Sequence, residues 1–156
     1  KKCLINIKNE DDKCLMYCVL LHINLSAITK NRDRVSQLNP FLTSFNWDGI
    51  KFPAKLNQIE KVENLVQHSI NVFGYDDKSV FPLRLSKWKK ADDIVSHSLI
   101  KREITDDTKI INLLLISKHE NGSEIQHYVY IKNLDKAAKI CIKNCIKTMH
   151  NMHKTA

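Results

Sequence analysis

Cys14 and His127 lie far apart in the sequence, but each has the surroundings that nucleophilic catalysis needs. Cys14 opens an apolar segment that predicts a buried helix, and the N–H groups at a helix start favour the thiolate form of a cysteine. His127 begins a run of strand-forming residues. A strand fixes the direction of a side chain, so the imidazole could carry protons for the thiolate. The alternative is that Cys14 is a small buried hydrophobe and that His127 makes an ordinary structural hydrogen bond.

Polar residues near both candidates could complete such a site. Asn9 could donate its side-chain amide to an oxyanion, although a turn-forming asparagine fits the same position, and Asp11 offers an N-cap oxygen to the helix. Asn133 and Asp135 share the strand parity of His127, but a straight strand places them about 20 Å away at about 3.3 Å per residue. One of them can orient the ring only if the chain bends back. Otherwise the site is a dyad, or the orienting group comes from elsewhere.

The elements that must position these residues alternate in type along the chain. Hydrophobic spacing predicts a short edge strand over 2–8, a buried helix over 14–23, an irregular stretch over 24–52 and a second helix over 56–66. Two hairpins follow, 69–75 with 79–85 and 109–117 with 125–132, separated by an exposed insertion, 88–108, that contains a short helix. A last helix over 134–153 presents an apolar stripe. One domain, 1–156, of class α+β is therefore expected, with the front helix packed on an antiparallel sheet and the last helix covering it.

Length and composition limit the functional classes. The chain has 156 residues, a net charge of +8 and only three glycines and three prolines, which excludes fibrous and linker-like proteins. No apolar run approaches the roughly 20 residues that a membrane span requires. An odd number of cysteines, five, predicts a reducing, intracellular compartment, cytoplasm or nucleus. Because the chain starts at Lys1, we expect a processed piece of a longer product.

The last 25 residues carry six lysines and one acid, which is five of the eight net positive charges. This concentration leaves open a non-specific interaction with nucleic acid, although a solvated helix face explains it as well. The same segment holds Cys141, Cys145, His150 and His153, which are zinc-ligand types. At about 100° per residue these four side chains do not converge on a continuous helix. We therefore expect no metal and no cofactor.

Local sequence around the candidate pair resembles a known family. Asp11 and Cys14 fit the Asp-x-x-Cys motif of OTU-type (ovarian-tumour-like) cysteine peptidases, and His127-Tyr128 resembles their His-(Tyr/Trp) strand. A closer resemblance is to the peptidase-like segment ahead of protein-primed family-B DNA polymerases in Polinton/Maverick-type transposons and related invertebrate virus-like elements. In that segment the motif reads Asn-x-Asp-x-x-Cys, and Asn9 matches its first residue. Further similar blocks follow in the same order, at residues 49–53, 70–75, 81–84, 111–116 and 127–134.

The resemblance implies a papain-like (OTU-like) fold and a cysteine peptidase, deubiquitinase-like or processing a viral or transposon polyprotein. Cys14 would attack a peptide or isopeptide carbonyl, and Asp11 would shape the oxyanion loop. The partner would be ubiquitin, a ubiquitin-like protein or the element's own polyprotein, with no membrane involved. The sequence departs from the family at Val129, where OTU-type enzymes often place Asn or Asp. A catalytically inactive interaction module with a peptidase fold is therefore the alternative, and a basic nucleic-acid-binding domain is a weaker one.

Overall fold

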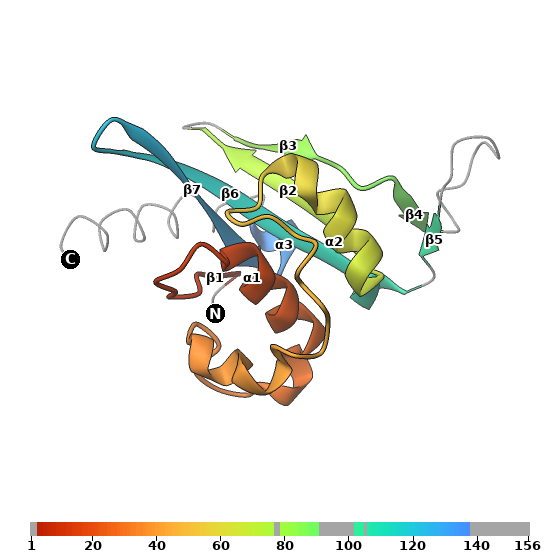
Figure 1. Cartoon of the computed structure of the whole chain (residues 1–156). Helices are drawn as coiled ribbons and strands as arrows, with labels where there is room; N and C mark the ends of the chain where they lie inside the picture. Colours follow the sequence, from red (N-terminus) through yellow and green to blue (C-terminus); the bar gives the residue numbers. More distant parts are fainter. Residues whose placement is uncertain (1–2, 77–78, 91–101, 105, 138–156) are drawn as a thin grey trace.

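The computed structural model describes residues 3–76, 79–90, 102–104 and 106–137 (Figure 1). Five strands form the main sheet in the order β1-β7-β6-β2-β3. Their bounds are Leu4–Ile5 (β1), Ser69–Tyr75 (β2), Val80–Arg84 (β3), Ile110–Glu120 (β6) and Ser123–Ile131 (β7). A separate parallel pair consists of β4 (Trp88–Lys90) and β5 (Arg102–Ile104). The class is α+β, as expected.

The sheet is mixed rather than antiparallel, which corrects one part of the sequence prediction. Both predicted hairpins form, since β2 pairs antiparallel with β3 and β6 pairs antiparallel with β7. The two hairpins join through β2 and β6, which run parallel with Ser69 opposite Ile110. A parallel pair needs a crossover between its strands, and in the chain β2 and β6 are separated by β3 and by residues 85–109. Two hairpin patterns along a sequence do not show how the hairpins dock onto each other.

Helices cover one face of this sheet on the side that holds the larger core. α1 (Cys14–Ile23) and α2 (Ile59–Val66) lie in front of the sheet in Figure 1, and their apolar residues form one cluster with Tyr128 and Tyr130 of β7. α1 is buried from Cys14 to Leu21, in agreement with its apolar character all round. On the opposite face Val129 of β7 packs in a second, smaller cluster.

Other boundaries differ from the prediction in detail. The helix expected over 56–66 begins with a single 3-10 turn, Leu56–Gln58, before α2 continues to Val66. The irregular stretch contains two more 3-10 segments, Leu25–Ala27 and Val35–Phe41. In the insertion, the described residues include β4, β5 and the first part of a 3-10 turn, Asp107–Lys109.

The C-terminal helix is described only at its beginning. α3 spans Leu134–Lys136, and Ala137 is buried against the smaller cluster. Most of the predicted helix over 134–153, with its apolar stripe and the zinc-type residues, lies outside the described residues.

A buried carboxylate fastens α2 to the sheet. Glu63 is 1% exposed, and its oxygens accept hydrogen bonds from the backbone N–H of Ile70 at 2.9 Å and from the hydroxyl of Ser86. Arg84 at the end of β3 completes the site with an ion pair of 2.6 Å to Glu63 and a hydrogen bond of 2.7 Å to the Ile70 carbonyl. The helix, β2 and β3 are thus joined by one polar cluster inside an apolar layer.

Candidate active site

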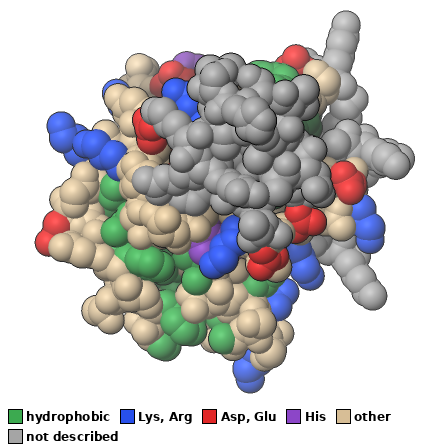
Figure 2. All heavy atoms as spheres, turned by 90° about the vertical axis from the view of Figure 1, so that its right-hand side faces the viewer, with side chains coloured by type: hydrophobic (Ala, Val, Ile, Leu, Met, Phe, Trp, Pro, Cys, Tyr) green, Lys and Arg blue, Asp and Glu red, His purple; other side chains and the backbone are tan. Residues whose placement is uncertain are grey.

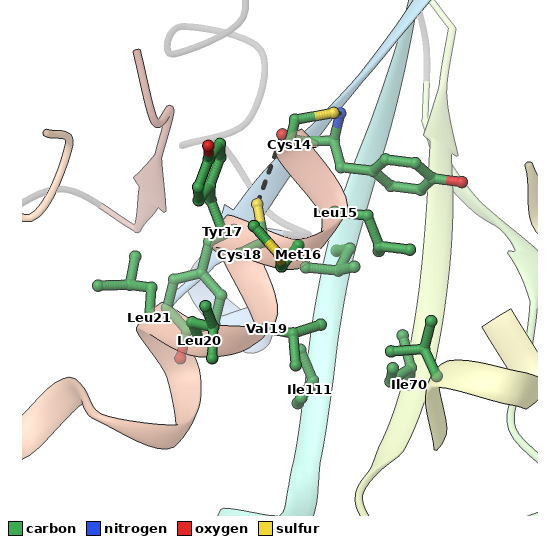
Figure 3. Packing of buried hydrophobic residues seen from close by; sticks show 14 of the residues in the cluster. Cys14, Leu15, Met16, Tyr17, Cys18, Val19, Leu20, Leu21, Ile70 and Ile111 are labelled. Carbon is green, nitrogen blue, oxygen red and sulfur yellow. Dashed lines mark hydrogen bonds between the residues drawn. The ribbon is translucent and has the colours of Figure 1, made fainter. Parts of the chain in front are cut away.

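Two cysteines of α1 meet one residue of β7. The Sγ atom of Cys14 accepts a hydrogen bond from the backbone N–H of Tyr128 at 3.5 Å, and the thiol of Cys18 donates to the carbonyl of Tyr128 at 3.5 Å. Figure 3 shows both sulfur atoms on the same side of α1. Since these backbone groups point away from β6, α1 occupies the edge of β7 where a further strand would otherwise pair. Tyr128 directly follows His127, so the helix start reaches the strand at the position that the sequence predicted.

The His127 ring lies at the same edge of β7 and contacts the chain that follows β1. Its Nε2 atom is 2.6 Å from Oδ1 of Asn6. β1 pairs with β7 through Ile5 and Tyr130, and this places Asn6 beside the His127 end of the strand. An amide oxygen only accepts hydrogen bonds, so Nε2 carries the hydrogen and Nδ1 is the proton-accepting atom of the neutral ring.

Side-chain alternation separates the ring from the face on which α1 packs. The Tyr128 side chain points into the larger core, where its hydroxyl donates to the carbonyl of Ala54 at 2.7 Å. The neighbouring His127 side chain leaves the strand on the other face. Because the Cys14 sulfur lies at the strand edge and not above either face, the imidazole reaches it only around that edge.

Burial opposes ionisation of the Cys14 thiol. Cys14 is 7% exposed, and desolvation raises its pKa above the ordinary value. Backbone N–H groups of Tyr128, Leu15 and Cys14 lower the pKa in part, whereas the charge of Asp11 raises it further. The helix start therefore supplies the predicted favourable dipoles, but the apolar surroundings outweigh them in this state of the protein. The same N–H groups of Cys14 and Leu15 lie next to the sulfur, close to where the oxygen of an attacked carbonyl would carry negative charge.

The loop ahead of Cys14 is organised by Asp11. Its carboxylate accepts hydrogen bonds from the backbone N–H of Lys13 at 3.1 Å and from the hydroxyl of Tyr17 at 2.5 Å. Asp11 does not act as the predicted N-cap, because Lys13 occupies that position and has no side-chain cap bond. Burial by itself would raise the pKa of Asp11, but the hydrogen bonds from Tyr17, Lys13 and Asn9 together hold it below the ordinary value.

Asn9 adopts the turn-forming role that was the alternative for it. Its Nδ2 atom donates to the carbonyl oxygen of Asp11 at 2.8 Å and to the Asp11 carboxylate at 3.1 Å. These two contacts direct the amide nitrogen into the loop. Among the described residues, its buried Oδ1 atom has no hydrogen-bond partner.

Asn133 and Asp135 lie at the start of α3. The Oδ1 atom of Asn133 accepts from the backbone N–H of Lys136 at 3.0 Å, which is a helix cap. Asp135 is exposed in the first turn, where a carboxylate stabilises the helix dipole. The contacts described for these residues are thus explained by α3 itself.

The side chain that contacts His127 was missed by sequence reasoning. Asn6 comes from the other end of the chain and stands between Ile5 and Ile7, one polar residue in a short apolar segment. That interruption was a signal in the sequence. It pointed to His127 only once β1 was known to be the neighbour of β7.

Within the part of the chain that the structure describes, no cluster of three or more metal-ligating side chains occurs. Cys14 and Cys18 are free thiols, whereas Cys3 is disulfide-bonded. None of the helices among the described residues combines the length and apolar character that crossing a bilayer requires.

The face shown in Figure 2 carries interspersed acidic and basic side chains around hydrophobic ones. Described side chains on this face therefore do not form the single-sign patch that nucleic-acid binding favours.

Comparison with known proteins identifies no relative: no family model, curated protein or solved structure matches this chain significantly.

Proposed function

We propose that this protein is a cysteine peptidase that uses Cys14 as nucleophile and His127 as general base and acid. The observation that carries the proposal is the contact between the Cys14 sulfur and the backbone N–H that follows His127, 3.5 Å long, together with the orientation of the His127 ring by Asn6. A nucleophile, a base and a group that orients the base are the three parts of such a site.

Each step uses a group already described. His127 Nδ1 takes the thiol proton, and the Cys14 sulfur attacks a peptide or isopeptide carbonyl. The N–H groups of Cys14 and Leu15 stabilise the oxyanion. Collapse of this intermediate transfers the His127 proton to the leaving amine and leaves an acyl-enzyme, which water hydrolyses with His127 again as base. Asn6 keeps the hydrogen on Nε2 and therefore keeps Nδ1 in the basic form.

The substrate class and the compartment remain part of this proposal. Resemblance to OTU-type peptidases and to the polymerase-associated segment of Polinton-like elements supports ubiquitin, a ubiquitin-like protein or the element's own polyprotein as substrate. A papain-like fold agrees with the order of elements, a front helix followed by a sheet. An intracellular compartment is part of the proposal, and Cys14 is the free thiol that the reaction needs. The disulfide of Cys3 does not support the reducing conditions expected from the number of cysteines.

A second function is favoured by the burial of Cys14. A thiol that is 7% exposed and has a raised pKa is poorly prepared for attack, which fits a peptidase fold retained as a non-catalytic interaction module. In that case Cys14 and Cys18 serve only to join α1 to the edge of β7.

Alkylation of Cys14 distinguishes the two functions. The rate of modification by iodoacetamide should be measured against pH for the wild type, for His127→Ala and for Asn6→Ala. A contact between thiolate and imidazole predicts a reactive form that persists below the ordinary thiol pKa, is lost in His127→Ala and is weakened in Asn6→Ala. Cys14→Ala is the control for site assignment. Identical profiles in all three proteins would leave only the interaction module.

Substrate cleavage needs its own assay. A ubiquitin-based or peptide-based thiol-reactive probe should form an adduct that depends on Cys14 and survives in Cys18→Ala, because Cys18 is fully buried. Absence of any adduct with a folded protein would refute the peptidase proposal for those substrates.

A further inference from the structure

A cavity opens at the start of α1, on the side of the helix that faces the irregular stretch. Its volume is about 390 Å³, and its walls come from the first turn of α1 and from residues 42–48. Lys13, the residue directly before Cys14, belongs to the wall, and consecutive Cα atoms are about 3.8 Å apart. The cavity therefore lies within the reach of a substrate whose carbonyl is at Cys14.

Apolar and aromatic side chains form the larger part of the lining, together with the polar Thr43 and Asn46. Met16 and Tyr17 contribute from α1, and Leu42, Phe45 and Trp47 contribute from the opposite wall. Phe45 and Trp47 also contact each other edge to face, with ring centroids 6.3 Å apart. Lys13 and Asp48 supply one positive and one negative charge, so the lining has no net charge. Such a site favours an uncharged, apolar side chain.

Trp47 provides a second, independent observation. Its Nε1 atom is buried and, among the described residues, has no hydrogen-bond partner. An unsatisfied buried donor is costly. A ligand that brings a hydrogen-bond acceptor to this nitrogen is therefore favoured over a ligand that leaves the nitrogen unpaired. The nitrogen is covered in this state, and the indole must turn toward the cavity to meet an acceptor. A backbone carbonyl next to the bound side chain is the acceptor that a peptide carries.

We propose that this cavity is the substrate subsite that selects an apolar side chain near the scissile bond, with Trp47 donating to a backbone carbonyl of the peptide. The inference rests on the proposed peptidase function. It adds to that function the class of residue that the enzyme accepts.

Tryptophan fluorescence tests peptide binding in this cavity without the need for catalysis. The chain has two tryptophans, Trp47 and Trp88, so Trp88→Phe leaves Trp47 as the only indole. Cys14→Ala in the same protein prevents turnover. Acetylated tripeptide amides that differ in one residue, Leu, Phe, Gly or Asp, are then titrated against the Trp47 emission.

Saturable shifts are expected for the Leu and Phe peptides, with affinity about ten-fold or more above that of the Gly and Asp peptides. Thr43→Phe fills the cavity from an exposed lining position and should abolish the shift, whereas Ser44→Phe, an exposed neighbour that does not line it, should not. Equal affinity for all four peptides, no saturable shift, or equal effects of the two variants would overturn the subsite.

The two proposals fail separately in this design. Selective binding together with an unreactive Cys14 in the wild type refutes the peptidase and leaves an apolar peptide-binding cavity. A reactive Cys14 with no peptide shift refutes the subsite and leaves the peptidase.

Discussion

Replacing Glu63 by Gln tests the polar cluster that fastens α2 to the sheet. The carboxylate accepts hydrogen bonds from Ile70 and Ser86 and pairs with Arg84 at 2.6 Å. Gln is of the same size as Glu, but its NH₂ group donates hydrogen bonds and would face other donors where the carboxylate accepted. The substitution also leaves Arg84 without its counter-charge. The Arg84 side chain is 18% exposed, so solvent screens part of this loss.

Breaking a buried ion pair from one side costs about 3–5 kcal/mol. Because Arg84 is partly exposed, the expected cost of Glu63→Gln is about 3 kcal/mol, at the lower end of this range. Native domains are stable by about 5–15 kcal/mol, so this is a large fraction of the free energy of unfolding. For a chain of this size, the expected fall in Tm is about 6–12 °C.

Urea unfolding followed by circular dichroism measures this loss, with Glu124→Gln as the matched control because Glu124 is exposed. Arg84→Met and the double variant complete a thermodynamic cycle, which should give a coupling of about 1 kcal/mol or more between Glu63 and Arg84. A loss below about 1 kcal/mol for Glu63→Gln, or additive single variants, would show that the apolar contacts of α2 hold it without the charge pair.

Three further predictions concern stability. Burial lowers the pKa of His22 and His68, so the unfolded chain binds protons first as the pH falls; stability should be constant above about pH 6.5 and decline below it, by up to about 1.4 kcal/mol per pH unit for each group. Urea midpoints measured from pH 8 to 5 check this: His22→Gln should flatten the decline, and exposed His119→Gln should not. Gln67 ends α2 with φ at 56°, so Gln67→Gly should raise the free energy of unfolding by about 0.5–1 kcal/mol, and a loss would mean that its side-chain bond to Asn64 matters more. Gly122→Ala should lower Tm because φ is 79° in the β6–β7 turn, and an unchanged Tm would contradict the strain argument.

Local sequence patterns were sufficient to predict the helix and the hairpin that carry Cys14 and His127. The apolar run from Cys14 to Ile23 predicted α1 with its observed bounds, because a helix that is apolar all round can only be stable when buried. The Asn121-Gly122 turn predicted the β6–β7 hairpin that holds His127, because both residues accept a positive φ.

Docking of distant segments was decided by the tertiary structure. The parallel pairing of β2 with β6 depends on a crossover whose path has no periodic signal in the sequence. The order of the strands then makes β1 the neighbour of β7 and brings Asn6, rather than Asn133 or Asp135, to the His127 ring.

By itself, therefore, the sequence determined which residues are nucleophilic or basic and which local elements hold them, since helix and strand periodicities act over a few residues. Only the tertiary structure decided that Cys14 and Cys18 bind the edge of β7 at Tyr128, and that burial raises the pKa of the Cys14 thiol. Both depend on how segments more than a hundred residues apart exclude water from each other, which local spacing does not encode.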